Sequence, residues 1–376
     1  MRKMIGADCG NDALKITVAN KEEIKKVEVM NVISPGYVRR TISGGKLQLV
    51  NLLDVNVLEG NKDLGRYFVG GLAYKAARGD LMERTREDKK SKSLETLIVL
   101  VTGVAFSLYD PISPKNKYQV DLGTVLPIEE YFKDELKDEF YSKLYGKTFT
   151  VKFNDEAFKG AEITITFTNV VVAAENVAAT VYYAYDDDGE YKKDYANLTE
   201  EIHLGIDIGS ITTDVAIIDG GEFISLFGIP MGTSEPLDKI IQDLKDQYDL
   251  EISRHQLDYI IRKEKPLKIN INGEVKDLTD ALNIIKENRY RNFVSLLVNK
   301  IHKELSVNGI NTKLINRVNM IGGGALTCYN LFSEAFSLSN VNLVEDPRFA
   351  NSKGVLKLIM SQVESEEIAQ DEVLNS

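Results

Sequence analysis

The sequence has no tryptophan, three histidines and two cysteines in 376 residues. His203, His255 and His302 fall in different expected elements without metal-ligand spacing, so we expect them to be structural. Cys9 and Cys328 give neither a disulfide framework nor a metal cluster. These scarcities argue against a disulfide-stabilised fold, a metal site built on histidine or cysteine, and a Ser-His-Asp or Cys-His catalytic centre.

Positive charge and long apolar runs are also scarce. The chain has 46 Lys and Arg against 57 Asp and Glu, a formal net charge of −11. Because non-specific DNA binding depends on a basic surface, we expect no direct DNA binding. No run approaches the ~18 apolar residues of a membrane span, and the Met-Arg-Lys start lacks an apolar signal core. We therefore expect a cytoplasmic protein that does not bind membranes.

Two stretches about two hundred residues apart share one pattern. Residues 6–12 read GADCGND and residues 205–211 read GIDIGSI. Each has an apolar strand that carries an Asp near its end, then one residue, a Gly, a small polar turn and a second strand. Each could be an ordinary hairpin turn. As a pair, they predict a duplicated chain in which each copy opens one half; 376 residues are enough for two domains.

This pattern suits anion binding. A Gly-containing turn can direct several backbone N–H groups into one concavity, and Gly allows phosphate oxygens to approach closely. Asp8 and Asp207 cannot contact phosphate directly without repulsion, so we expect each to hold Mg²⁺ through water. Two such hairpins would bind a polyphosphate from both sides.

A third stretch, residues 317–325, predicts a short strand that ends in Gly322, Gly323 and Gly324 and leads into a helix. Consecutive glycines let a flat ring or ribose lie against the backbone at a helix start. The stretch could also be a flexible strand–helix turn. It matches neither the Rossmann nor the P-loop pattern.

In this order, the three stretches resemble the phosphate-1, phosphate-2 and adenosine motifs of the actin, sugar kinase and heat-shock-chaperone ATPase superfamily. The chain is most similar to the bacterial actin-like proteins of plasmid partitioning, the ParM and Alp group. Residues 170–179, VVVAAENVAA, resemble the first connecting motif, and residues 348–360 resemble the second. The resemblance therefore extends over residues 5–360.

The resemblance implies an α/β, actin-like two-domain fold. Each domain would hold a mixed five-stranded sheet flanked by helices, with the nucleotide in the cleft between the domains. We expect domain I at 1–180 with an inserted subdomain around 34–93, and domain II at 181–345. A C-terminal helix at 346–363 would return to domain I, and 364–376 would form a disordered tail.

The resemblance also assigns site residues. Glu175 would position or activate the attacking water, with Asp8 and Asp207 as the Mg²⁺ carboxylates, and Lys15 would reach the β- and γ-phosphates. Arg262 and Lys263 lie where relatives contact the purine and ribose, although a plain surface cluster is an equal alternative. The residues expected to contact nucleotide are Gly10, Asn11, Asp12, Lys15, Gly209, Ser210, Ile211, Thr212, Gly232, Thr233, Arg262, Lys263, Gly322, Gly323, Gly324 and Ala325.

The implied function is a filament-forming ATPase that uses ATP, possibly GTP, with Mg²⁺ and segregates plasmid DNA. The chain would polymerise with itself and reach DNA through an adaptor of the ParR type. Two alternatives are a small-molecule kinase of the same superfamily, for which no carboxylate base stands out, and a slow-turnover cytoskeletal scaffold. The charge-dense segment 80–93 is expected to be a solvated loop, with a basic partner contact as the alternative.

Overall fold

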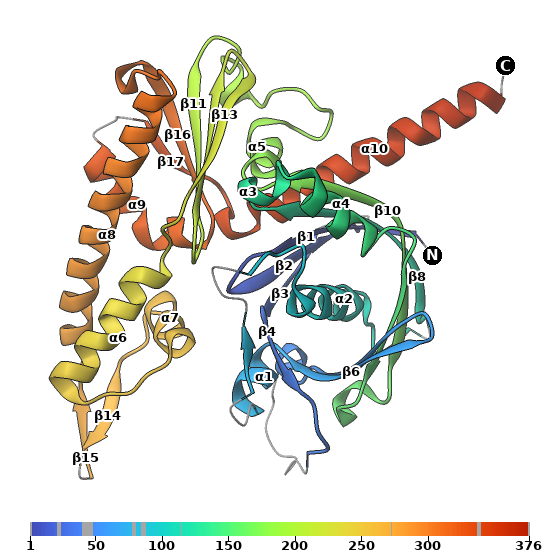
Figure 1. The fold of residues 1–376 in the computed structure, drawn as a ribbon, viewed down its shortest axis with the longest axis horizontal. Coiled ribbons are helices and arrows are strands. Elements are labelled where there is room, and N and C mark those ends of the chain that lie inside the picture. Colours follow the sequence, from blue (N-terminus) through green and yellow to red (C-terminus); the bar gives the residue numbers. More distant parts are fainter. Residues whose placement is uncertain are drawn as a thin grey trace. The chain divides into compact units, whose positions relative to one another are not determined.

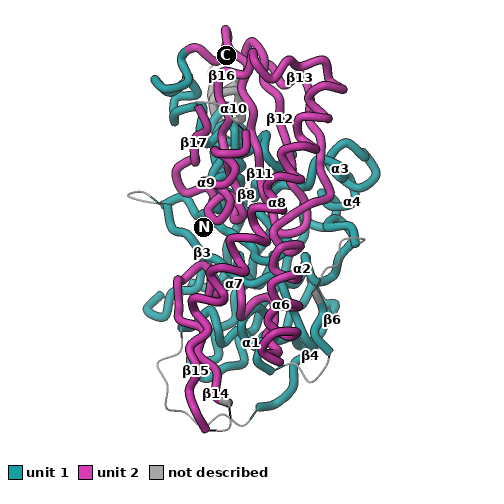
Figure 2. Tube along the Cα trace, turned by 90° about the vertical axis from the view of Figure 1, so that its left-hand side faces the viewer, with its two compact units in different colours: residues 1–196, 348–376 teal, residues 197–347 magenta. Residues whose placement is uncertain are grey.

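The computed structural model describes residues 2–20, 24–39, 48–76, 80–83, 88–113, 115–271, 273–336 and 340–374. The chain divides into two compact units, coloured separately in Figure 2. Unit 1 comprises residues 1–196 and 348–376, and unit 2 comprises residues 197–347. Segment 181–196, which the sequence assigned to the second domain, lies in unit 1, where Lys357 Nζ donates to Tyr185 O at 3.2 Å.

Unit 1 is built on one mixed sheet with the strand order β3-β2-β1-β8-β10-β9-β5-β6-β4-β7. Its strands are β1 (Arg2–Cys9), β2 (Ala13–Val18), β3 (Lys25–Met30), β4 (Val32–Pro35), β5 (Asp54–Glu59), β6 (Lys62–Val69), β7 (Met82–Glu83), β8 (Lys117–Leu126), β9 (Thr148–Phe153) and β10 (Glu162–Ala174). Its helices are α1 (Gly71–Ala76), α2 (Leu94–Leu108), α3 (Ile128–Tyr131), α4 (Asp134–Ser142), α5 (Val177–Ala184) and α10 (Ala350–Leu374).

The expectation of a five-stranded sheet is wrong for unit 1, whose described residues form ten strands. The expected five are present as β3-β2-β1-β8-β10. The sheet continues because β9 pairs antiparallel with β10 and then with β5, which connects the segment from the 34–93 region to the same sheet. That segment was expected to form a separate inserted subdomain; in the structure, its strands complete the sheet.

Helix α2 lies inside the curve of this sheet (Figure 1). It packs against β1, β2, β3, β4, β5, β9 and β10. Eleven of its fifteen residues are buried, which explains why its sequence is apolar on nearly all sides. Ser93 caps its start by accepting a hydrogen bond from the Thr96 N–H.

Helix α10 covers the sheet at β1, β8 and β10 and also packs on α5. Small residues allow this close approach: a Cβ at Gly6 would lie 2.0 Å from Ser352 O, and one at Gly354 would lie 1.6 Å from Ala178 O. Thr17 Oγ1 donates to Ser352 O at 2.9 Å. The backbone of α10 remains helical to Leu374, past residue 364, where a disordered tail was expected to begin.

Unit 2 is built on a five-stranded sheet of order β13-β12-β11-β16-β17. Its strands are β11 (Ile202–Ile208), β12 (Thr213–Asp219), β13 (Glu222–Ile229), β16 (Ile315–Ile321) and β17 (Val341–Leu343), with a separate hairpin of β14 (Lys268–Ile271) and β15 (Glu274–Asp277). Its helices are α6 (Ser234–Tyr248), α7 (Arg254–Arg262), α8 (Thr279–Val307) and α9 (Gly323–Phe336). The Asn-Gly turn expected at 272–273 falls partly outside the described residues.

The two units repeat one arrangement of strands. In each, the order along the sheet is two antiparallel pairings followed by two parallel ones: β3-β2-β1-β8-β10 in unit 1 and β13-β12-β11-β16-β17 in unit 2. The hairpins β1–β2 and β11–β12 occupy equivalent places, as the paired sequence motifs predicted. Within the described part of the chain, no helix is long and apolar enough to cross a membrane.

Candidate nucleotide-binding site

The first cluster of candidate residues lies at the turn between β1 and β2. In this hairpin Asp8 pairs with Lys15, and Cys9 with Leu14, which leaves Gly10, Asn11 and Asp12 in the turn. Asn31, between β3 and β4, holds this turn in place. Its side-chain Nδ2 donates to Gly10 O at 2.8 Å, and its backbone N–H donates to Asp12 O at 2.9 Å.

The Lys15 side chain folds over Gly10. A Cβ at Gly10 would lie 2.6 Å from Lys15 Nζ. The same ammonium lies 3.9 Å from Asp8 Oδ2. The structure therefore brings Asp8, the turn and Lys15 together, with a buried carboxylate beside a cation. Because burial of charge costs free energy, packing alone does not explain this charged turn.

Glu175 lies close to this turn because of the sheet topology. Strands β1, β8 and β10 run parallel, and Asp8 and Glu175 both come from the carboxyl ends of such strands, an edge where ligand sites are common. The Glu175 N–H donates to Leu126 O at 2.8 Å. Asn176, at φ 68°, then turns the chain into α5, and its N–H donates to Asn351 Oδ1 at 3.0 Å.

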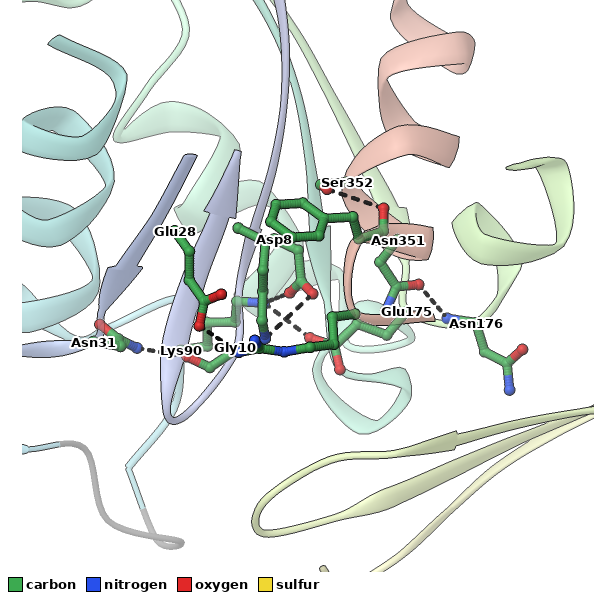
Figure 3. Close-up of polar contacts among 12 residues, drawn as sticks. Asp8, Gly10, Glu28, Asn31, Lys90, Glu175, Asn176, Asn351 and Ser352 are labelled. Carbon is green, nitrogen blue, oxygen red and sulfur yellow. Dashed lines mark hydrogen bonds and ion pairs between the residues drawn. The ribbon is translucent and has the colours of Figure 1, made fainter. Parts of the chain in front are cut away.

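Lys90 completes the cluster, and sequence reasoning missed it. Its side chain is fully buried, with Nζ 2.8 Å from Glu175 Oε1 and 3.8 Å from Asp8 Oδ1 (Figure 3). The expectation that segment 80–93 is wholly a solvated loop is wrong at this residue. Nothing in the run of charges around Lys90 distinguishes it from its neighbours, so the sequence carries no local signal for its burial.

A second buried carboxylate, Glu130, fixes the loop that carries Lys90. Glu130 Oε1 accepts the Lys90 N–H at 2.8 Å, and Oε2 accepts the Ser91 N–H at 3.0 Å. Lys143 Nζ adds a bond to Ser91 O at 2.7 Å. Glu130 lies in the first turn of α3, and its carboxylate anchors the 90–91 backbone.

The second cluster lies in unit 2, at the turn between β11 and β12. Asp207 pairs with Asp214 and Ile208 with Thr213, which leaves residues 209–212 in the turn. The Gly209 N–H closes it by donating to Thr212 O at 2.9 Å. Asp207 is 6% exposed, about as buried as its counterpart Asp8 at 5%.

Gly232 and Thr233 pack directly on this turn. A Cβ at Gly232 would lie 2.2 Å from Ser210 O, and the Thr233 N–H donates to Gly209 O at 3.1 Å. Ser234, at the start of α6, donates its N–H to Ser210 O at 2.8 Å. Residues 209–210 and 232–233, far apart in sequence, therefore form one backbone cluster.

The triple-glycine turn joins the same cluster. Gly322, at φ 84°, is so close to the hairpin that a Cβ would lie 2.2 Å from Asp207 Oδ1. A Cβ at Gly324 would lie 2.5 Å from Ile208 Cγ2. Gly323 begins α9. Ala325 is fully buried in the core of unit 2, so its side chain packs in the protein and is not available to a ligand.

The remaining expected nucleotide residues lie on the surface. Ile211 and Thr212 are partly exposed within the turn, and Thr212 Oγ1 donates to Asp214 Oδ2 at 3.3 Å. Arg262 forms an ion pair with Asp258 of the same helix, and the Lys263 N–H donates to Tyr259 O at 3.1 Å at the end of α7. These contacts are with α7 itself, and a role for either residue in ligand binding stays a prediction.

The pKa values of two histidines and one cysteine are shifted by burial. Burial lowers the pKa of His203, while its Nε2 contact of 2.7 Å with Glu201 Oε2 opposes that change. Burial also lowers the pKa of His302, and it raises the pKa of the Cys328 thiol to about 12. A thiol that stays protonated is a poor nucleophile.

The residues present fit a cation held mainly by phosphate and water. Among the described residues, no group of three or more His, Cys, Asp and Glu forms a ready metal site. Asp8 Oδ1 is nevertheless buried and accepts no hydrogen bond, so it is a carboxylate oxygen with capacity for a cation or its water. A carboxylate oxygen of this kind suits Mg²⁺, which keeps most of its waters and uses few protein ligands.

Comparison with known proteins places this site in a family context. Residues 6–177 match the family model of the N-terminal domain of actin-like proteins. This part of the chain is therefore similar to actin-like N-terminal domains, in agreement with the resemblance drawn from the motifs. No curated protein matches the chain by sequence.

Solved structures extend the likeness to the rest of the chain. The actin-like protein Alp7A is 18% identical with a TM-score of 0.74, over 99% of this chain and 100% of that one. A ParM from a 15-stranded filament of Clostridium botulinum is 20% identical with a TM-score of 0.73, over 96% and 99%. Bacillus thuringiensis ParM with AMPPNP is 19% identical with a TM-score of 0.66, over 96% and 99%. The chain has the actin-like fold.

Proposed function

We propose that this protein is a filament-forming ATPase whose two hairpin turns bind opposite sides of one Mg-ATP. The observation that carries the proposal is the repeated pair of turns, each with a buried Asp at the end of its first strand. A solved ParM of the same fold holds AMPPNP, which supports a nucleoside triphosphate as the ligand. GTP is an alternative, since no residue here is seen to select the purine.

Each cluster has a defined part in binding. Gly10, Asn11 and Asp12 in unit 1, and Gly209, Ser210 and Thr212 in unit 2, line the phosphates, mainly through backbone N–H groups. The Gly209 N–H itself stays bonded to Thr212 O within the turn. Lys15 supplies a positive charge on the unit 1 side. Gly322, Gly323 and Gly324, between β16 and the first turn of α9, would contact the adenosine. Asp8 and Asp207 hold Mg²⁺ through water, and the cation neutralises charge on the β- and γ-phosphates.

Glu175 is the residue we assign to hydrolysis. It stands at the carboxyl end of β10, on the same sheet edge as the phosphate-binding turn, and its side chain is 14% exposed. A carboxylate in that place can orient a water for in-line attack on the γ-phosphate and accept its proton. We expect slow turnover that serves as a timer, with ATP favouring assembly and ADP favouring disassembly.

The cellular role we propose is plasmid segregation by a polymer of this chain. A ParM of the same fold forms a 15-stranded filament, which supports self-association here. The formal net charge of −11 makes the chain a poor DNA ligand, so an adaptor of the ParR type would contact the DNA.

Nucleotide binding can be tested by calorimetric titration of wild type and Asp207→Ala with Mg-ATP. The wild-type protein should bind saturably. The variant should lose at least about tenfold in affinity, because one of the two cation carboxylates is gone. Asp219→Ala, at the exposed far end of β12, is the matched control and should bind as wild type does. Equal affinity for Asp207→Ala and wild type would remove Asp207 from the site.

A further inference from the structure

We infer that Lys90 is a built-in counter-cation, which keeps divalent cations away from Asp8 and Glu175 until a nucleotide arrives. The inference rests on the proposed function for the identity of the ligand. Its structural basis is the cluster in Figure 3, where one ammonium lies 2.8 Å from Glu175 Oε1 and 3.8 Å from Asp8 Oδ1.

The burial of Lys90 shows that the cluster is specifically arranged. A lysine side chain with no exposed surface loses its hydration, and only compensation by nearby carboxylates makes this tolerable. The two carboxylates are themselves 8% and 14% exposed at their side chains. Without Lys90, two negative groups would lie near each other with little water to separate them. The lysine therefore supplies charge compensation that a divalent cation could otherwise supply.

Backbone contacts keep the ammonium in this place. Both carboxylate oxygens of Glu130 accept N–H groups from Lys90 and Ser91, so the base of the side chain is anchored independently of Asp8 and Glu175. Lys15 flanks the other oxygen of Asp8 at 3.9 Å. A divalent cation that approached Asp8 alone would meet two ammonium groups, each less than 4 Å from a carboxylate oxygen of Asp8: Lys90 Nζ at 3.8 Å and Lys15 Nζ at 3.9 Å. Their repulsion opposes binding of the cation.

A polyphosphate reverses this balance. Its negative charges can take over both ammonium groups as partners, which leaves Asp8 free to accept the cation or its water. Cation and nucleotide would then bind together, and the protein without nucleotide would not take up Mg²⁺ by itself. Lys90 is a positioning residue in this account, since its bond to Glu175 also fixes where that carboxylate points.

The test measures the affinity of the nucleotide-free protein for Mn²⁺. Electron paramagnetic resonance reports the concentration of free Mn²⁺ during the titration. Wild type should bind Mn²⁺ at least tenfold more weakly without nucleotide than with AMPPNP. Lys90→Met, which removes the charge but keeps the length, should bind Mn²⁺ at least tenfold more tightly than wild type without nucleotide. Lys90→Gln, which also keeps a hydrogen-bond donor to Glu175, should do the same, and Lys90→Arg should behave as wild type does.

Two further variants assign the effect to this cluster. Lys92→Met, two residues along the same loop and 60% exposed at its side chain, should leave Mn²⁺ binding unchanged. Adding Glu175→Gln to Lys90→Met should remove most of the gain, because one of the two carboxylates is then neutral. A melting curve for each variant establishes that it is folded.

The outcomes separate this inference from the proposed function. If wild type binds Mn²⁺ equally well with and without AMPPNP while AMPPNP itself binds, the inference is wrong and the nucleotide site stands. The same holds if the folded Met and Gln variants show no gain. If AMPPNP fails to bind wild type at all, the proposed function is wrong, whereas a Mn²⁺ gain in the charge-removing variants would still support the role of Lys90.

Discussion

Gly322 of the triple-glycine turn lies directly against the carboxylate of Asp207. A Cβ at Gly322 would be 2.2 Å from Asp207 Oδ1 and 2.6 Å from Ile208 O, and the residue has a φ of 84°. Two motifs about 115 residues apart in sequence are therefore packed as one unit in the structure. Any side chain at 322 must displace the carboxylate that we assign to the cation.

Gly322→Ala should therefore impair nucleotide binding as well as stability. The methyl group forces Asp207 to move and adds strain at positive φ, about 1–3 kcal/mol in the free energy of unfolding. Calorimetric titration should show at least about tenfold weaker binding of Mg-ATP.

The control for this change is Gly309→Ala. Gly309 also has a positive φ, 73°, but no atom lies within 4 Å of the position of its Cβ. In urea unfolding, Gly309→Ala should lose a similar amount of free energy of unfolding to backbone strain, while its nucleotide affinity should stay normal. If both variants bind Mg-ATP as wild type does, contact of Gly322 with Asp207 has no part in the site.

Glu175→Gln should separate hydrolysis from binding. Its amide keeps the size of the side chain but cannot accept a proton, so phosphate release should fall by about 10²–10⁴-fold. Nucleotide affinity should stay within about threefold of wild type, and filaments should persist longer. Phosphate release at the wild-type rate, measured on the same samples as affinity, would assign hydrolysis to another residue.

Glu130→Ala should loosen the loop that carries Lys90. Two backbone N–H groups, of Lys90 and Ser91, would lose a buried charged acceptor, at a cost of about 2–4 kcal/mol in the free energy of unfolding. Urea denaturation measures the change. Glu129→Ala is the matched control, since Glu129 is exposed in the same helical turn, and should shift stability by less than about 0.5 kcal/mol. Equal shifts for the two variants would show that the anchor contributes nothing.

Burial of His203 should make the protein less stable in mild acid. Because burial lowers the pKa of His203 below the 6.5 of a free imidazole, the unfolded chain takes up a proton before the folded chain does. The contribution of His203 is therefore complete above pH 6.5 and is lost as the pH falls below that value, by up to about 1.4 kcal/mol per pH unit. His302 acts in the same direction.

Urea unfolding at pH 7.5 and pH 5.5 measures this loss. His203→Gln, which can still donate to Glu201, should lose less stability between these two pH values than wild type does. An identical loss in the variant and wild type would show that His203 does not titrate as its burial indicates.

Much of the fold was predictable because its signals are local. The apolar strands around Asp8 and Asp207, the small turn residues and the apolar helix at 94–108 each follow from a short stretch of sequence. The pairing of β9 with β5 was not predictable, since it joins strands about 90 residues apart and depends on tertiary packing. It is the reason that the sheet of unit 1 has ten described strands instead of five.

The candidate site likewise contains residues that a local motif predicts and others that only distant contacts determine. Gly232 and Gly322 could be proposed from motif resemblance, but the contacts that require glycine there come from distant residues. Lys90 could not be found, because a lysine in a run of charges normally stays hydrated. Its burial depends on Glu130 and on two carboxylates from other strands, none of which is adjacent in sequence.

We propose that ATP binding drives assembly of this chain and that hydrolysis drives its disassembly. Right-angle light scattering with Mg-ATP, Mg-GTP and Mg-ADP, together with phosphate release on the same samples, tests it most directly. We predict a rise in scattering with a triphosphate, followed by decay as phosphate appears, and no rise with Mg-ADP. Flat scattering at saturating triphosphate, with nucleotide bound, would contradict a filament-forming ATPase.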